Sequence, residues 1–284
     1  MGEARSLAEA VRTVASLPEI YLRLSRVVHD PRSSADDVGQ VICQDPGLTA
    51  RLLRIVNSAV YDFPYSIETV SHALRVVGTL QLLDLSLATA VVRVFRDIPR
   101  DLMDMAGFWK HSLACAIGAR LVGKWLRASN TERLFVAGML HDIGRPVLAL
   151  ERSEGFRRAL ERCRRTGELL YLVESEELGF THSEVGRELL DLWGLSPCLQ
   201  EVVGNHHAPS RTSVFQVETA AVHVADVFAN AMAMGSSGER AAPPLVADAW
   251  EALGLPLDAV PAILERMNIE YSSLVAEILV TEAA

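Results

Sequence analysis

Imidazole and carboxylate side chains recur along this sequence in a pattern that could hold a transition metal ion. Five of the eight histidines lie in short segments with other features of a site, and a downstream aspartate completes the series. In chain order the candidate ligands are His111, His141, Asp142, His182, His206, His207 and Asp226. Neutral imidazole and carboxylate oxygen are the mixed ligands that suit Fe, Mn, Zn or Co. The four cysteines are scattered without CxxC spacing, which argues against a structural zinc cage.

Each candidate ligand also has a simpler explanation when it is taken alone. A lone histidine on an apolar helix face, such as His111, is usually a satisfied core residue. A histidine in a helix-capping segment, such as His182, is often a surface residue, and Asp226 could simply hydrogen-bond the backbone. The metal hypothesis therefore rests on the combination of residues.

The elements that must position these residues are helices. No convincing run of alternating β-branched residues bounded by turns is present, so the expected fold class is all-α. Helix N-caps are expected at Ser34, Asp45, Ser66, Thr131, Thr181 and Ser196. Thr181 and Glu184 have the spacing of a capping box, which places His182 in the first turn of a helix. Gly144 and Pro146 are expected to end the helix that leads to His141.

Small side chains surround the expected position of His111. Ala114, Cys115 and Gly118 share its helix face, and Ala225 lies next to Asp226 on another small-residue face. Small residues let neighbouring helices approach closely. We therefore expect His111 to lie deep between helices.

A polar, proline-containing joint at 98–104 divides the chain. The expected organisation is an N-terminal helical half over 1–100, a second half with the His/Asp pocket over 101–233, and a loop with outer helices over 234–284. The segment 234–244, MGSSGERAAPP, has the composition of a mobile loop.

Composition narrows the function classes. The 284 residues carry a net charge of −9, which argues against a non-specific nucleic-acid binder because such a protein needs a basic face. The longest mostly apolar run, 85–92, is too short to span a bilayer, and the N-terminus lacks the features of a signal peptide. A cytoplasmic protein with reduced thiols and no membrane partner is expected.

The motifs also resemble a known family. LHDIG, with His111 upstream and Asp226 downstream, looks like the HD superfamily of metal-dependent phosphohydrolases. QDPGLTARLLRIVNSAVY and SIETVSHALRVVG resemble the N-terminal part of the HDOD (HD-related output) domain. FWKHSLACA, GFTHSEVGRELLDLWGL and VVGNHHAP follow in that family's order. The resemblance runs from about Leu17 to about Asn230 and implies a bundle of two packed helical halves, the second of HD type.

The resemblance implies roles for the candidate ligands. HD phosphohydrolases hold one ion with the residues that match His111, His141, Asp142 and Asp226. In the related HD-GYP phosphodiesterases a second ion uses three more histidines, which match His182, His206 and His207. Asp142 would bridge the two ions. One or two divalent transition metal ions and no organic cofactor are therefore expected.

Two departures from the hydrolase pattern favour regulation over catalysis. Arg145 follows the HD motif where hydrolases usually carry lysine, and no GYP motif follows His207. Arginine does not lose its proton, so a proton-donating role would not transfer. We expect a signal-transduction output module, the output half of a response regulator, that binds a signalling protein or receiver domain, or a nucleotide or other phosphorylated molecule. The alternatives are a metal-dependent phosphohydrolase, with Asp142 and Arg145 as catalytic residues, and a nucleotide receptor without turnover.

Overall fold

A computed structural model describes residues 2–11, 16–95, 98–212, 214–236, 238 and 242–278. Over these residues the protein is all-α, as the sequence predicts, and contains no strand. The chain forms two compact units that interleave along the sequence. Unit 1 comprises residues 1–16 and 95–267, and unit 2 comprises 17–94 and 268–284. These units differ from the three consecutive segments expected from the sequence. Residues 1–16 belong to the unit formed by 95–267, and residues 268–284 belong to the unit formed by 17–94.

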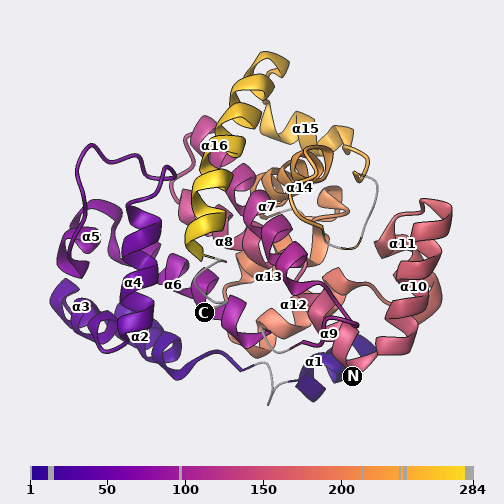
Figure 1. The fold of residues 1–284 in the computed structure, drawn as a ribbon, viewed down its shortest axis with the longest axis horizontal. Helices are drawn as coiled ribbons and strands as arrows, with labels where there is room; N and C mark the ends of the chain where they lie inside the picture. Colours follow the sequence, from indigo (N-terminus) through magenta and orange to yellow (C-terminus); the bar gives the residue numbers. More distant parts are fainter. Residues whose placement is uncertain are drawn as a thin grey trace. The chain divides into compact units, whose positions relative to one another are not determined.

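Unit 1 contains the larger share of the helices. They are α1 (Glu3–Ala10), α7 (Met105–Trp125), α8 (Thr131–Leu140), α9 (Gly144–Glu151), α10 (Ser153–Thr166), α11 (Leu170–Leu178), α12 (His182–Leu192), α13 (Pro197–Asn205), α14 (Gln216–Ala231) and α15 (Ala247–Leu253), with short 3-10 helices η2 (Pro209–Arg211) and η3 (Leu257–Ala259). Helix α7 packs against both α8 and α14 in the core of this unit (Figure 1).

Glycines allow these core helices to approach closely. A Cβ on Gly138 of α8 would lie 2.7 Å from the Cα of Ala116 in α7, and one on Gly118 of α7 would lie 3.0 Å from the Cβ of Ala225 in α14. His111 lies on the same helix α7 with only 1% of its surface exposed. The small-residue faces expected from the sequence therefore bury His111 between helices. Glycine against alanine at these contacts lets the helix backbones approach closely.

Unit 2 consists of α2 (Glu19–His29), α3 (Ala35–Cys43), α4 (Pro46–Val56), α5 (Val70–Val77) and α6 (Thr79–Val94), and it receives the end of α16 (Val260–Ile278). Among the described residues no single helix combines the length and the apolar character needed to cross a membrane. Helices α5 and α6 have sufficient length and apolar character only when they are taken together, and the chain bends by 114° at their junction. The loop expected over 234–244 lies partly outside the described residues.

Most of the expected helix starts agree with the structure. Ser34 and Thr181 form capping boxes, and the side chains of Asp45 and Ser196 accept hydrogen bonds from backbone N–H groups in the first turns of their helices. Two expected caps are wrong. Thr69, and not Ser66, caps α5, and Asn130, and not Thr131, caps α8. In both cases the side-chain oxygen of the observed cap accepts a hydrogen bond from the backbone N–H three residues later.

The segment after His141 also differs from expectation. Helix α8 ends at Leu140, and Gly144 and Pro146 begin α9 instead of ending α8. Proline is tolerated there because the N–H groups of a first helical turn have no partner within the helix. His141 and Asp142 consequently lie in a tight turn between two helices.

Candidate metal centre

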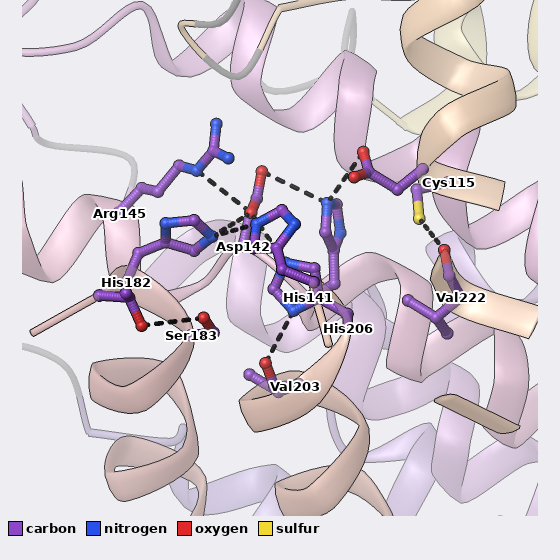
Figure 2. A network of polar contacts seen from close by, with 12 residues as sticks. Cys115, His141, Asp142, Arg145, His182, Ser183, Val203, His206 and Val222 are labelled. Atoms are coloured by element: carbon purple, nitrogen blue, oxygen red, sulfur yellow. Dashed lines mark hydrogen bonds and ion pairs between the residues drawn. The ribbon is translucent and has the colours of Figure 1, made fainter. Parts of the chain in front are cut away.

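The structure brings all seven candidate ligands together within unit 1. His111 comes from the N-terminal third of α7, His141 and Asp142 from the turn before α9, and His182 from the start of α12. His206 and His207 follow the end of α13, and Asp226 lies on α14. His141, His182 and His206 converge on Asp142 (Figure 2). Helices that are far apart in the sequence thus contribute donors to one centre.

The donors form two groups. The first contains His111, His141 and Asp226, and the second contains Asp142, His182, His206 and His207. Within each group one donor atom per residue lies within 4.8 Å of the donor atoms of the others. Such a spacing allows one ion to contact every member of a group after small side-chain movements.

Asp142 connects the two groups through its two carboxylate oxygens. Oδ2 faces the first group, at 3.3 Å from Nε2 of His141 and 4.0 Å from Nε2 of His111. Oδ1 faces the second group, at 3.0 Å from Nε2 of His182 and 3.6 Å from Nε2 of His206. This division of oxygens is the arrangement in which a carboxylate can bridge two sites.

Hydrogen bonds on the outer side of the imidazoles orient them for metal binding. Nδ1–H of His141 donates to the carbonyl of Gly138 at 2.7 Å, and Nδ1–H of His206 donates to the carbonyl of Val203 at 2.8 Å. A carbonyl only accepts, so Nδ1 carries a proton, and Nε2 is the ring nitrogen that points to the centre. Both Nε2 atoms are buried without a well-aligned hydrogen bond to a described residue. Second-shell acceptors of this kind are typical of metal-binding histidines, so the residues present fit a divalent ion.

Glu174 on α11 is the corresponding partner of His182. Its Oε2 accepts from Nδ1–H of His182 at 2.6 Å and from the backbone N–H of His182 at 2.8 Å, and the side chain is fully buried. Sequence reasoning missed this residue, because Glu174 lies in the acidic segment ESEEL and resembles its exposed neighbours. No signal in the sequence distinguishes it.

The protonation states follow from these surroundings. Burial lowers the pKa of His206 to about 4, so this imidazole is neutral at pH 7. Burial also opposes protonation of His182, but the Glu174 carboxylate outweighs it and raises the pKa of His182 to about 9. For Asp142, burial is outweighed by Arg145 and His141, which hold its pKa well below the usual value. The centre therefore contains ionised carboxylate at neutral pH.

Three further residues support the donors and were not predicted. Asn230, one turn after Asp226 on α14, donates to Oδ1 of Asp226 at 2.8 Å. His223 donates through Nδ1–H to the carbonyl of His206 at 2.8 Å and accepts from the N–H of Val246. Tyr171 stacks on His207 with ring centroids 4.3 Å apart. His223 had stood apart from the site-like segments, and only its contacts reveal its role.

We expect Glu174→Gln to destabilise the protein by about 2 kcal/mol, because it replaces the carboxylate in two charge-assisted hydrogen bonds to His182. Urea unfolding measured against wild type tests this effect. Glu176→Gln is the matched control, because Glu176 is exposed on the same helix α11 and is expected to change stability by less than about 0.5 kcal/mol. An equal effect of the two substitutions would show that Glu174 does not hold His182.

Comparison with known proteins identifies relatives of the whole fold. The HDOD domain model matches residues 14–209. A crystal structure of an HDOD domain protein with unknown function from Geobacter sulfurreducens superposes with a TM-score of 0.79 at 23% identity, covering 97% of this chain and 98% of that one. A protein from Shewanella amazonensis SB2B, provisionally named a phosphohydrolase, gives a TM-score of 0.76 at 23% identity, covering 96% of this chain and 98% of that one.

One relative is considerably longer than this chain. An uncharacterised protein of Treponema pallidum (strain Nichols) is 25% identical over 213 residues, which are 72% of this chain and 40% of that protein. This chain thus spans less than half the length of that relative. The two crystal structures establish the helical fold.

Proposed function

This chain belongs to the HDOD family, and on that premise we propose that it is a signalling module, the output half of a response regulator. Unit 1 would hold a divalent metal ion, and the module would act by binding a protein partner or, at that ion, a phosphorylated small molecule. The match to part of a longer relative supports a module that works inside larger proteins. The observation that carries the proposal is the enclosure of a complete set of donors.

Six of the seven donor residues are at most 2% exposed, and only His207 is half-buried. A set of oriented imidazoles and carboxylates in this environment favours binding of an ion, because buried charges require compensation. The same enclosure leaves little access for a large substrate. A ligand would approach past His207 and the Tyr171 ring stacked on it.

Arg145 supports a regulatory role over catalysis. Its Nε lies 3.1 Å from Oδ1 of Asp142, and the side chain is 1% exposed. A guanidinium keeps its proton, so this residue cannot act as the general acid that a leaving group requires. Arg145 is instead positioned to balance the charge of Asp142.

One observation favours the second candidate function, a metal-dependent phosphohydrolase. The two oxygens of Asp142 face separate donor groups, as in enzymes that place two ions on a substrate. When bound, the ions would supply positive charge to stabilise a phosphoryl group. His207 at the edge of the centre would then orient the substrate.

Metal loading and ligand binding distinguish these functions. We expect chelator-treated protein to take up Mn²⁺ and to gain thermal stability, since an ion at 100 times its Kd contributes about 2.7 kcal/mol. Inorganic phosphate or GMP should raise the Tm further only when Mn²⁺ is present. His72→Gln in unit 2 is the control and should respond as wild type does.

The same preparations are then assayed with bis(4-nitrophenyl) phosphate. We expect no turnover above that of Asp142→Asn. Turnover that this substitution abolishes would contradict the regulatory proposal and favour the phosphohydrolase. Protein that takes up no metal would contradict both functions.

A further inference from the structure

A hollow of about 200 Å³ lies in unit 1, beside the joint that precedes α7. Three segments enclose it: residues 100–104 of the joint, one face of α10, and Ser236 and Gly238 after α14. The described lining residues include none of the seven candidate metal ligands. The joint therefore forms the wall of a second cavity, in addition to connecting α6 and α7.

The floor of this hollow is apolar and comes from two of the segments. Phe156 and Leu160 lie one turn apart on α10 and are 2% and 8% exposed, and Met103 of the joint is 8% exposed. The joint is held as a turn, because the carbonyl of Pro99 accepts hydrogen bonds from the N–H groups of Leu102 and Met103 at 3.0 and 3.2 Å. An apolar group that settles on this floor leaves water, which favours binding.

Four charged side chains, two of each sign, also line the hollow. They are Arg100, Asp101, Asp104 and Arg164. All four are exposed, and none of their side chains forms an ion pair or a hydrogen bond with another residue in the described part of the chain. Arg162 on the same helix α10, by contrast, pairs with Glu168 at 2.6 Å and with Glu176 at 2.7 Å. The charges around the hollow are therefore available to a ligand.

The carboxylate of Asp104 is unused at a position where it normally serves a helix. Asp104 is the N-cap residue of α7, but its side chain accepts no hydrogen bond from the first turn. A Cβ on Gly107 would lie 2.6 Å from Oδ2 of Asp104, so the carboxylate lies alongside that turn. The N–H of Ser236 donates to the carbonyl of Gly107 at 3.0 Å, which fixes the third segment next to this carboxylate.

The charges and the floor together define the class of ligand. A simple anion that approached the arginines would also meet two aspartates, and a simple cation would also meet two arginines. A zwitterion matches both signs, because a carboxylate binds a guanidinium and an ammonium binds a carboxylate. The hollow is smaller than the roughly 300–1,000 Å³ of sites for drug-sized ligands, so the molecule must be small.

We propose that this hollow binds a free α-amino acid with an aliphatic side chain. The carboxylate of the amino acid faces Arg100 and Arg164, its ammonium faces Asp101 and Asp104, and its side chain lies on the apolar floor. The inference goes beyond the proposed function and does not depend on it, because no donor of the metal centre takes part. It gives the module a second ligand that binds without metal.

Saturation-transfer difference NMR of the full chain with L-leucine as the probe tests the proposal. Because the charges around the hollow are exposed and water screens them, we expect a Kd of about 1 mM. The Kd is expected to be the same in the presence of EDTA. Binding that requires added Mn²⁺, or no saturation transfer to L-leucine, would overturn the proposal.

Three analogues test each part of the ligand. 4-Methylpentanoate lacks the ammonium of L-leucine, 3-methylbutylamine lacks the carboxylate, and glycine lacks the side chain. Each is expected to bind about fivefold more weakly than L-leucine, the factor that one exposed charge pair supplies at most. Equal binding of 4-methylpentanoate would identify a plain anion site, and equal binding of glycine would show that the floor is not used. Either result contradicts the proposal.

Paired substitutions assign the two charges of the ligand. Arg100→Gln with Arg164→Gln is expected to abolish the preference for L-leucine over 3-methylbutylamine, because the carboxylate is no longer recognised. Asp101→Asn with Asp104→Asn is expected to abolish the preference for L-leucine over 4-methylpentanoate. All four residues are exposed, so both variants are expected to fold as wild type does.

The control removes two other exposed arginines of α10. Arg157→Gln with Arg158→Gln makes the same change in net charge and is expected to keep the wild-type Kd for L-leucine. An equal loss of affinity in this control would show a general effect of charge and overturn the assignment. Preferences that persist in both paired variants would place the amino acid outside this hollow.

Discussion

Replacing Asp142 with Asn is expected to reduce bound metal to less than one-tenth equivalent. Asp142 contacts histidines of both donor groups, at 3.3 Å from His141 and 3.0 Å from His182. The amide has almost the same size but carries no charge, so an ion in either group loses a negative ligand. Elemental analysis after loading with Mn²⁺ measures the loss.

The same substitution removes the carboxylate charge that faces the buried guanidinium of Arg145. Removing one partner of a buried ion pair typically costs about 3–5 kcal/mol, so the metal-free variant should also unfold at lower urea concentration. Asp248→Asn is the matched control, because Asp248 is exposed and is expected to change stability by less than about 0.5 kcal/mol. Unchanged metal content in folded Asp142→Asn would remove this residue from the centre.

Gly144→Ala is expected to destabilise the protein by about 3 kcal/mol, the upper part of the range for overpacked cores. A Cβ at this position would overlap the carbonyl oxygen of His182 and would lie 2.8 Å from the backbone nitrogen of Gly186. Backbone atoms of α12 cannot rotate away as a flexible side chain can. Helices α9 and α12 must therefore separate, and His182 must move away from Asp142.

Urea unfolding of Gly144→Ala measures this cost, with Gly39→Ala as the control. Gly39 also lies within a helix, but the nearest atom to an added Cβ there is 3.4 Å away, an ordinary contact. Alanine has the higher helix propensity, so the control is expected to be neutral or to gain up to about 1 kcal/mol. Equal stability of the two variants would show that the approach of α9 to α12 is not required.

The local elements of this protein could be read from the sequence because their signals are local. Ser34 and Thr181 form capping boxes with residues three positions later. The prolines that directly follow Asp45 and Ser196 mark two further helix starts. The errors at Ser66 and Thr131 arose where two residues with hydroxyl or amide groups compete for one cap. Only the backbone geometry chooses between such neighbours.

The donor set could be assembled from motifs, whereas its supporting residues could not. Glu174 resembles its exposed neighbours in an acidic segment, and His223 lies on an apolar helix face where a core histidine is the simpler interpretation. Their contacts join segments that are 8 and 17 residues apart, to His182 and to the carbonyl of His206. Such contacts depend on how the helices pack, and no local spacing encodes them.

The sequence by itself determined the all-α class, four of the six expected helix N-caps, the family and the seven candidate ligands, because periodicity, capping and motif order are properties of neighbouring residues. The tertiary structure alone decided which oxygen of Asp142 faces which donors, and that Arg145 stands at one of them. The reason is that Asp142 and Arg145 are each only 1% exposed, so the charges next to them belong to residues that helix packing brings together.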